Sequence, residues 1–466
     1  MALLAAAFCA AVPAAQAVSR ITWEDAAPVR AQLQARGLFA SAFPAYVDDI
    51  RQVHARRVRE GDVDHLIYYL LQSKRFTDLP AIEPAVSARA LVERLDAAER
   101  DRFLQDPALA APRIDTAVRT RAAALLRALD GPADDPRLAY FRELTSAVFP
   151  AARDREAGLL REYLRVMRFV YEKEFVAQRA ERPAQAVAEL YRTRGLSTDT
   201  AVEAGYLVYL GLGVLQSLAP AHAIRRVLIV GPGLDLAPRT ALDEAGPPES
   251  YQPWAVIDAL LSLRLATAEH LEVIAADINP RVVNHLRRSR VEPPVLTLVS
   301  EIADSETVTL AGEYRDYFAM LGRAVGDVDT DARGAADGHL RKRVKVRPQA
   351  AGALRAETLD IVTERLGGGQ FDLIVATNIL PYFDDTELTL ALANIGAMLA
   401  PGGAFLHNEA RPVLQDVTAA LGMRLEQSRH AVIATVRGAP APLFDSVWVH
   451  RRSHRRQGDQ EKFHRR

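Results

Sequence analysis

The stretch RVLIVGPGLDLAPRT at residues 226–240 decides the fold class of this protein. It starts with an apolar segment typical of a strand, continues through Gly231 and Gly233, and ends in a segment compatible with a helix. Glycine suits a turn in which the backbone bends sharply and lies close to a ligand, because a Cβ would block the approach. The stretch therefore predicts the phosphate- or nucleoside-binding turn of an open α/β sheet.

Composition limits the class of protein around this turn. The chain has 466 residues, too many for one ordinary core, so we expect two domains. Its 49% hydrophobic and 25% charged residues are typical of a soluble globular protein. The 58 basic and 59 acidic residues give a net charge of −1. The overall electrostatic field of the protein therefore does not attract nucleic acid or an anionic membrane. The single cysteine, Cys9, excludes an intrachain disulfide and a cysteine-cluster metal site, and no histidines have metal-ligand spacing, so we predict no metal.

The N-terminal segment, residues 1–18, is apolar and uncharged and resembles a signal peptide. Ala15 and Ala17 fit a signal-peptidase site. Against export, no Lys or Arg precedes the apolar run, and Pro13 makes the segment a poor membrane anchor. Two interpretations of this segment stay open. It is either a cleaved signal or the result of a mis-assigned start, or it is an ordinary alanine-rich helix. Whether residues 1–17 are cleaved is therefore not predicted.

Residues 19–195 have the pattern of a large all-α domain. VDHLIYYLLQSKRF (63–76) and GLLREYLRVMRFVYEKEF (158–175) place apolar residues at helical spacings. Turn-forming residues divide the region into about five to seven helices. We interpret the aromatic residues of the second segment as a core face rather than as a cofactor-binding stripe. The domain is expected to cover the carboxyl ends of the strands that follow and to select the substrate.

Residues 196–450 alternate between short apolar runs and helical segments, which predicts right-handed crossovers and a parallel sheet. Ser197–Thr200 is expected to cap a first helix at 205–219. The expected strands are RVLIV (226–230), LEVIAAD (271–277), VLTLVS (295–300), FDLIVAT (371–377) and GAFLHN (403–408). HAVIATV (430–436) and LFDSVWVH (443–450) are expected to close the domain as an antiparallel hairpin.

These residues resemble the class I S-adenosylmethionine-dependent methyltransferases over about residues 197 to 450. The resemblance implies a Rossmann-like parallel sheet with a reversed terminal strand, preceded here by the all-α domain. It is carried by Gly231-Pro232-Gly233, Asp277 at the end of the second strand, FDLIVATNIL at the fourth, Leu399-Ala400-Pro401-Gly402-Gly403 before the fifth, and the closing hairpin.

The resemblance implies S-adenosyl-L-methionine as cofactor. Asp277 at a strand tip can accept both ribose hydroxyls, or it can serve only to cap the next helix. Ile278 is expected to pack on the adenine. The backbone at Gly231 and Gly233 is expected to approach the methionine part and the ribose, and Asp235 to accept from the amino group.

Two features depart from the family pattern. Ile229 stands where many relatives carry an acidic residue. Asp277 follows Gly231 by 46 residues, where about 20 is usual, so we expect an inserted loop and helix near 241–265. A second insertion near 313–349 leaves the adenine-contacting residue open, and its basic run at 341–345 is interpreted as a solvated edge strand rather than an anion site.

The fourth-strand region carries Asn378, the last predicted cofactor-binding residue. Its surroundings resemble, locally, those of chemotaxis-receptor glutamate methyltransferases, which have a similar asparagine before Tyr-Phe-Asp and a His-x-Glu after the fifth strand. The rest of the chain does not match that subfamily, so its substrate is not carried over. His407, Glu409 and Tyr382 are candidate proton acceptors, but structural hydrogen bonding explains each equally well, and no catalytic base is assigned.

The resemblance implies methyl transfer to a small-molecule or protein acceptor. A non-catalytic binding protein on the same fold is the main alternative. An NAD-dependent oxidoreductase is disfavoured by the missing third glycine and by the closing hairpin. The cytosolic origin of S-adenosylmethionine favours a cytoplasmic location, against the signal-like N-terminus, and the basic tail at 451–466 is expected to be disordered. The oligomeric state is not predicted.

Overall fold

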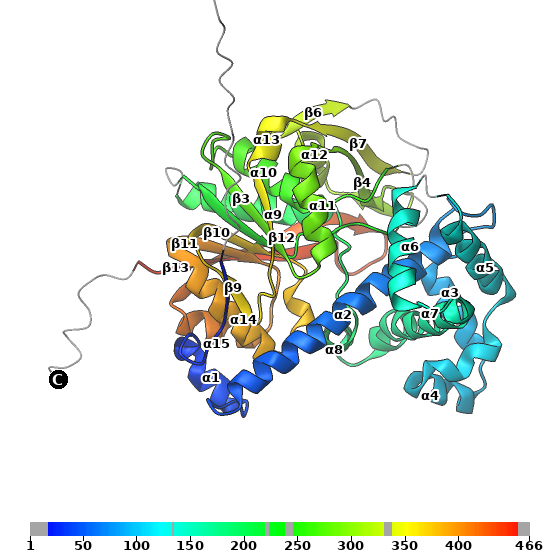
Figure 1. Ribbon diagram of the computed structural model, residues 1–466. Coiled ribbons are helices and arrows are strands. Elements are labelled where there is room, and N and C mark those ends of the chain that lie inside the picture. Colours follow the sequence, from blue (N-terminus) through cyan, green and yellow to red (C-terminus); the bar gives the residue numbers. More distant parts are fainter. Residues whose placement is uncertain (1–16, 133–134, 220–222, 238–245, 330–337, 455–466) are drawn as a thin grey trace, which may run out of the picture.

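The computed structural model describes residues 17–132, 135–219, 223–237, 246–329 and 338–454 (Figure 1). At its centre lies an eight-stranded sheet with the order β5-β12-β13-β11-β10-β2-β3-β8. Its strands are β2 (Arg226–Val230), β3 (Glu272–Asp277), β5 (Val308–Leu310), β8 (Leu354–Thr358), β10 (Phe371–Ala376), β11 (Leu399–His407), β12 (Met423–Val436) and β13 (Leu443–Arg452).

The direction of these strands confirms the predicted fold class. Strands β8, β3, β2, β10 and β11 form a parallel series, and β13 pairs antiparallel with both β11 and β12. The reversed strand therefore lies inside the sheet, between the fifth parallel strand and its own hairpin partner. Four of the five predicted parallel strands and the closing hairpin occur where the sequence predicted them.

The third parallel strand was predicted wrongly. VLTLVS belongs to β4 (Val295–Ala303), which lies outside the main sheet in a three-stranded sheet with β7 (His339–Val346) and β6 (Gly326–Asp329). The true third strand is β8, which pairs parallel with β3. Its sequence, LRAET, is half polar and buries alternate residues, because β8 is an edge strand; this weak signal was missed.

The basic run at 341–345 also differs from its predicted role. It lies in β7, as a strand, but β7 is the central strand of its sheet rather than an edge. Its side chains alternate, so that Lys342 and Val344 are buried while Arg343 and Lys345 are exposed.

The connection between β2 and β3 contains one helix in the described residues, α10 (Gln252–Ser262). Residues 231–237 and 246–251 form no helix after the glycine turn, so the extra length of the connection precedes α10.

Helices cover both faces of the sheet. Val227 and Ile229 of β2 join one core cluster, and Leu228 and Val230 join the other, as expected for a strand buried on both faces. The first face is covered by α9 (Glu203–Leu218), α10 and α11 (Pro280–Val291), and the second by α14 (Asp385–Met398) and α15 (Pro412–Ala420). Short helices α12 (Gly312–Met320) and α13 (Pro348–Gly352) belong to the connection that carries β4, β6 and β7.

The described part of the N-terminal region holds eight α-helices, where the sequence indicated about five to seven. They are α1 (Arg30–Ala35), α2 (Phe43–Gln72), α3 (Pro84–Glu93), α4 (Ala97–Gln105), α5 (Thr116–Asp130), α6 (Pro136–Val148), α7 (Arg155–Tyr171) and α8 (Pro183–Thr193). A five-residue π-helix, Glu172–Val176, continues α7.

The 30-residue helix α2 joins this region to the sheet (Figure 1). Phe43, Val47 and Ile50 in its first half pack in the core on the second face of the sheet. Leu66 and Leu70 in its last turns pack among the other N-terminal helices. Strand β1 (Val18–Arg20) also pairs with β9 (Glu364–Leu366), so the first described residues lie against the sheet domain.

The termini are described only in part. Most of the signal-like segment, residues 1–16, and the end of the basic tail, residues 455–466, lie outside the described residues. Of the predicted tail, Arg451 and Arg452 belong to β13. Among the described helices, none combines the length and apolar character needed to cross a membrane.

Candidate functional site

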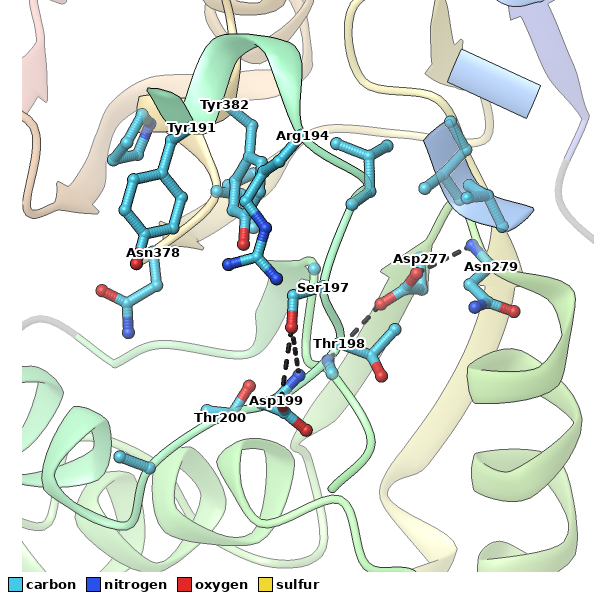
Figure 2. A pocket seen from close by; sticks show the side chains of 18 of the residues that line it. Tyr191, Arg194, Ser197, Thr198, Asp199, Thr200, Asp277, Asn279, Asn378 and Tyr382 are labelled. Atoms are coloured by element: carbon cyan, nitrogen blue, oxygen red, sulfur yellow. Dashed lines mark hydrogen bonds between the residues drawn. The ribbon is translucent and has the colours of Figure 1, made fainter. Parts of the chain in front are cut away.

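A cavity of about 610 Å³ opens at the carboxyl ends of β2, β3, β8 and β10, under the N-terminal helices (Figure 2). This is the edge at which parallel α/β sheets bind ligands. From the sheet it is lined by Gly231, Gly233, Asp277, Ile278, Asn279, Asp360, Thr377, Asn378 and Tyr382, and from the helical region by His54, Tyr68, Phe169, Lys173, Tyr191 and Arg194.

The glycine turn needs both of its glycines. Gly231 and Gly233 have φ angles of 67° and 75°, in the left-handed region that other residues avoid. A Cβ on Gly231 would lie 2.3 Å from the Ile379 side chain. A Cβ on Gly233 would lie 2.3 Å from the carbonyl oxygen of Thr198 and from Oγ1 of Thr200.

The linker Ser197–Thr200 lies on the glycine turn instead of capping a helix. The N–H of Leu234 donates to the Thr198 carbonyl at 2.8 Å, and the Thr198 hydroxyl donates to the Leu234 carbonyl at 2.8 Å. The predicted cap is therefore wrong: α9 starts after Val202, with no side-chain cap. These hydroxyl residues line the cavity, a role that the sequence pattern did not indicate.

Asp277 is buried at the tip of β3, 5% exposed. Its Oδ1 accepts from the N–H of Asn279 at 2.8 Å and its Oδ2 from the N–H of Gly233 at 3.4 Å. Burial raises the pKa of Asp277 to about 6, and the two amide bonds offset this only in part. The cap of α11 is Asn279, whose Oδ1 accepts from the N–H of Arg281, so Asp277 does not cap the helix.

Asp235 lies outside the residues that line the cavity. It is 5% exposed, and its N–H donates to the Glu249 carbonyl at 2.8 Å. Its predicted contact with the amino group of a cofactor finds no support in this position.

His54 and Asp360 are cavity residues that the sequence pattern did not reveal. Asp360 follows β8, and its Oδ2 lies 3.0 Å from Nδ1 of His54, whose Nε2 lies 3.2 Å from Oε1 of Glu387. Burial opposes a charge on His54, but the two carboxylates outweigh burial and raise its pKa to about 9. Asp360 is an acidic residue just after a strand, as Asp277 is at the end of β3. It was missed because β8 was not predicted as the third parallel strand.

Asn378 follows β10 and is exposed to the cavity, with φ of 63°. Its N–H donates to Oδ1 of Asn408 at 2.9 Å, and its Oδ1 accepts from Nδ2 of Asn408 at 2.6 Å. Figure 2 shows Asn378 and Asp277 on opposite sides of the segment that carries Ser197. Asn378 therefore marks a different part of the cavity from Asp277.

The three candidate proton acceptors have different positions. His407 is fully buried in β11, with Nε2 3.0 Å from Nδ1 of His450, and burial lowers its pKa well below the usual range. Glu409 pairs with Arg411 at 3.1 Å. Neither lines the cavity, whereas Tyr382 does. Burial raises the pKa of Tyr382, so its hydroxyl stays protonated at neutral pH.

Aromatic rings and one arginine line the cavity near Tyr382. Tyr191 meets Tyr382 edge to face, with ring centroids 5.4 Å apart. The guanidinium of Arg194 lies 4.3 Å from the ring centroid of Phe169 and 5.4 Å from that of Tyr191. Its Nη2 donates to Asp64 at 3.3 Å. This part of the cavity offers flat apolar surfaces beside a buried cation.

No protein-family model matches the sequence, and no curated protein matches it. Solved structures that resemble the chain include the N-methyltransferase NodS from Bradyrhizobium japonicum WM9 in complex with S-adenosyl-L-homocysteine, at 15% identity over 53% of this chain and 87% of that chain, with a TM-score of 0.27. Magnesium protoporphyrin IX methyltransferase (ChlM) from Synechocystis PCC 6803 with bound SAM has 9% identity over 61% of this chain and 94% of that chain, with a TM-score of 0.29. The glycopeptide N-methyltransferase MtfA complexed with S-adenosyl-L-methionine has 10% identity over 53% and 94%, with a TM-score of 0.28.

The strand order defines the fold, with the reversed strand β13 between β11 and β12. That order is the Rossmann-like arrangement implied by the resemblance to class I methyltransferases.

Proposed function

We propose that this protein transfers a methyl group from S-adenosyl-L-methionine to an acceptor bound between the sheet and the N-terminal helices. The observation that carries the proposal is the gathering of five predicted residues at one cavity. Gly231, Gly233, Asp277, Ile278 and Asn378 all line it, although they come from the ends of three different strands.

The surroundings of Asp277 fit the ribose of this methyl donor. In the described structure its carboxylate receives hydrogen bonds from backbone amides only. A buried carboxylate held only by amides gains from further donors, and two adjacent ribose hydroxyls supply them. Ile278 offers an apolar surface next to this position, which suits the adenine.

The glycine turn fits the rest of the donor. Gly231 and Gly233 line the cavity, and the linker Ser197–Thr200, which packs on the turn, adds hydroxyl groups beside it. The cavity lining holds six carboxylates, at Glu83, Glu174, Asp199, Asp277, Glu301 and Asp360, against three cations, at His54, Lys173 and Arg194. This excess of negative charge favours a ligand with a positively charged sulfur.

The donor supplies a methyl group bonded to that sulfur, and transfer by in-line displacement depends mainly on positioning. We assign the positioning of the donor to the strand ends and the selection of the acceptor to the N-terminal helices. Tyr68, Phe169, Tyr191 and Arg194 of those helices line the part of the cavity left for an acceptor.

Binding and turnover test the proposal separately. Calorimetry with S-adenosylmethionine and, in parallel, with NAD⁺ is expected to show binding of the first only. Incubation with S-adenosylmethionine and a mixture of candidate acceptors is expected to yield S-adenosylhomocysteine. Binding without turnover across a broad acceptor set would favour the non-catalytic alternative, and binding of NAD⁺ alone would contradict both.

A further inference from the structure

The orientation of the Asn378 side-chain amide is fixed by a chain of three residues. Nδ2 of Asn408 donates to Oδ1 of Asn378 at 2.6 Å and to Oδ2 of Asp445 at 3.1 Å. Oδ1 of Asn408 accepts from the backbone N–H of Asn378 at 2.9 Å. Asp445 lies on the reversed strand β13, so the chain joins the ends of β10, β11 and β13.

Two independent contacts determine which way the Asn408 amide points. A backbone N–H can only donate, so the Asn408 atom that meets it must be the oxygen. An ionised carboxylate can only accept, so the Asn408 atom that meets Asp445 must be the nitrogen. Both contacts require the same orientation, and the nitrogen of Asn408 then meets Oδ1 of Asn378.

As a consequence, Asn378 turns its own NH₂ group away from Asn408. Within the described part of the chain, Nδ2 of Asn378 donates to no protein atom, and the residue is exposed to the cavity. Its left-handed φ of 63° has a cost that the two bonds to Asn408 offset. The cavity wall after β10 therefore presents a hydrogen-bond donor in a fixed orientation.

Arg194 supplies a second donor to the same cavity. Its side chain is 9% exposed, and its guanidinium lies against Phe169 and Tyr191. Tyr191 in turn contacts Tyr382, four residues after Asn378. Figure 2 shows Asn378, Tyr191, Tyr382 and Arg194 around one part of the cavity, away from Asp277.

We propose that Asn378 selects an acceptor with a carboxylate group and that the methyl group is transferred to a carboxylate oxygen. The inference rests on the proposed methyl transfer and adds the class of acceptor. The NH₂ group of Asn378 donates to the carboxylate, and the guanidinium of Arg194, which pairs with Asp64 through Nη2, lines the same part of the cavity. An ammonium or protonated amine meets donors at both positions and is disfavoured.

The chemistry needs no base from the protein. A carboxylate oxygen uses a lone pair to form the new C–O bond, the bond between the methyl carbon and sulfur breaks, and its electron pair stays on sulfur. The products are a methyl ester and a neutral thioether, and no proton is released. This agrees with the positions of His407 and Glu409 outside the cavity and with the raised pKa of Tyr382.

The test compares acids and amines of matched shape. Benzoate, phenylacetate and 4-hydroxybenzoate, each with the amine of the same skeleton, are incubated with the full chain and S-adenosylmethionine, and S-adenosylhomocysteine is measured. Methylation of acids is expected. Asn378→Asp keeps the size and the left-handed backbone preference but replaces the donor by an acceptor, and it is expected to lower acid methylation about tenfold or more.

Two further variants separate orientation from folding. Asn408→Asp keeps an oxygen that accepts from the N–H of Asn378 but removes the NH₂ group that meets its Oδ1, and it is expected to reduce discrimination between acids and amines, measured as the ratio of their kcat/KM values. Asn284→Asp, at an exposed position on α11, is the matched control and is expected to keep that ratio.

Binding of S-adenosylhomocysteine is measured for every variant, so that a failed cofactor site is recognised separately from a wrong acceptor class. Wild-type binding together with methylation confined to amines, or with no acid methylated, overturns the inference. Unchanged acid methylation by Asn378→Asp overturns the role of Asn378.

Discussion

Nδ1 of His54 lies 3.0 Å from Oδ2 of Asp360, and Nε2 of the same ring lies 3.2 Å from Oε1 of Glu387. One buried imidazole thus links the long helix α2 to the end of β8 and to α14. Because its pKa is about 9, the ring is charged at neutral pH. This ionic bridge therefore holds α2, which contributes to the acceptor side of the cavity, against the sheet.

Replacing His54 with Gln is expected to lower the free energy of unfolding by about 3 kcal/mol near neutral pH, because two buried carboxylates lose their cation. The folded-state pKa, about 9, lies above the ordinary value of 6.5. The stabilisation of the folded protein by the charged His54 ring is therefore fully present below pH 6.5 and is lost as the pH rises through 9. Denaturant titrations from about pH 6 to about pH 10 measure the difference.

The exposed His270 provides the control for this pH series. His270→Gln is expected to leave the free energy of unfolding unchanged within about 0.5 kcal/mol at each pH. A constant difference between wild type and His54→Gln across the whole range would contradict the assigned ionic bridge.

Gly233→Ala is expected to destabilise the protein by about 2 kcal/mol or more, because the added Cβ meets two oxygens of the linker at 2.3 Å and the backbone is left-handed. Gly213→Ala is the matched control. Gly213 lies inside α9 and has open space within 4 Å of the point that a Cβ would occupy, so alanine there is expected to stabilise by up to about 1 kcal/mol. Thermal and denaturant unfolding report both values, and equal effects of the two substitutions would contradict the assigned geometry of the turn.

The ionisation of Asp277 predicts pH-dependent ligand binding. Its carboxylate accepts hydrogen bonds from ribose best when ionised, and its pKa is about 6. Affinity for S-adenosylhomocysteine is therefore expected to be constant above about pH 7 and to fall as the pH drops through 6. Calorimetry across this range tests it, and an affinity that rises on acidification would argue against the assigned contact.

The ionised form of Asp277 also costs the folded protein free energy, because its folded-state pKa lies above the ordinary value of 3.8. At pH 7 the charge is present and buried, so Asp277→Asn is expected to unfold no more readily than wild type while it loses ligand affinity. Circular dichroism during thermal unfolding checks the first part. Asp277 thus lowers the stability of the folded protein while it contributes to ligand affinity.

The sequence predicted the parts of the fold that carry strong local signals. β2, β3 and β10 are continuous apolar runs because the strands are buried on both faces, and each was predicted within two residues. β8 was missed because an edge strand needs fewer apolar residues, while the apolar run of β4 was placed in the wrong sheet. Apolar character indicates a strand but does not identify its partners.

The candidate site was predictable where it follows a strand end. Asp277, Ile278 and Asn378 were found from their position after β3 and β10. His54 and Arg194 were missed because they come from helices whose packing over the sheet has no local signal. Asp235 was chosen from its place in the motif, but it lies outside the residues that line the cavity, and its backbone N–H donates to the Glu249 carbonyl.

The central claim is that this cavity binds S-adenosylmethionine through Asp277. Titration of S-adenosylhomocysteine into wild type, Asp277→Asn and Asp235→Asn at about pH 7.5, above the pKa of Asp277, tests it most directly. We predict binding by wild type, about 10- to 100-fold weaker binding by Asp277→Asn, and an affinity within about twofold of wild type for Asp235→Asn. No binding by wild type, or equal binding by wild type and Asp277→Asn, would contradict the claim.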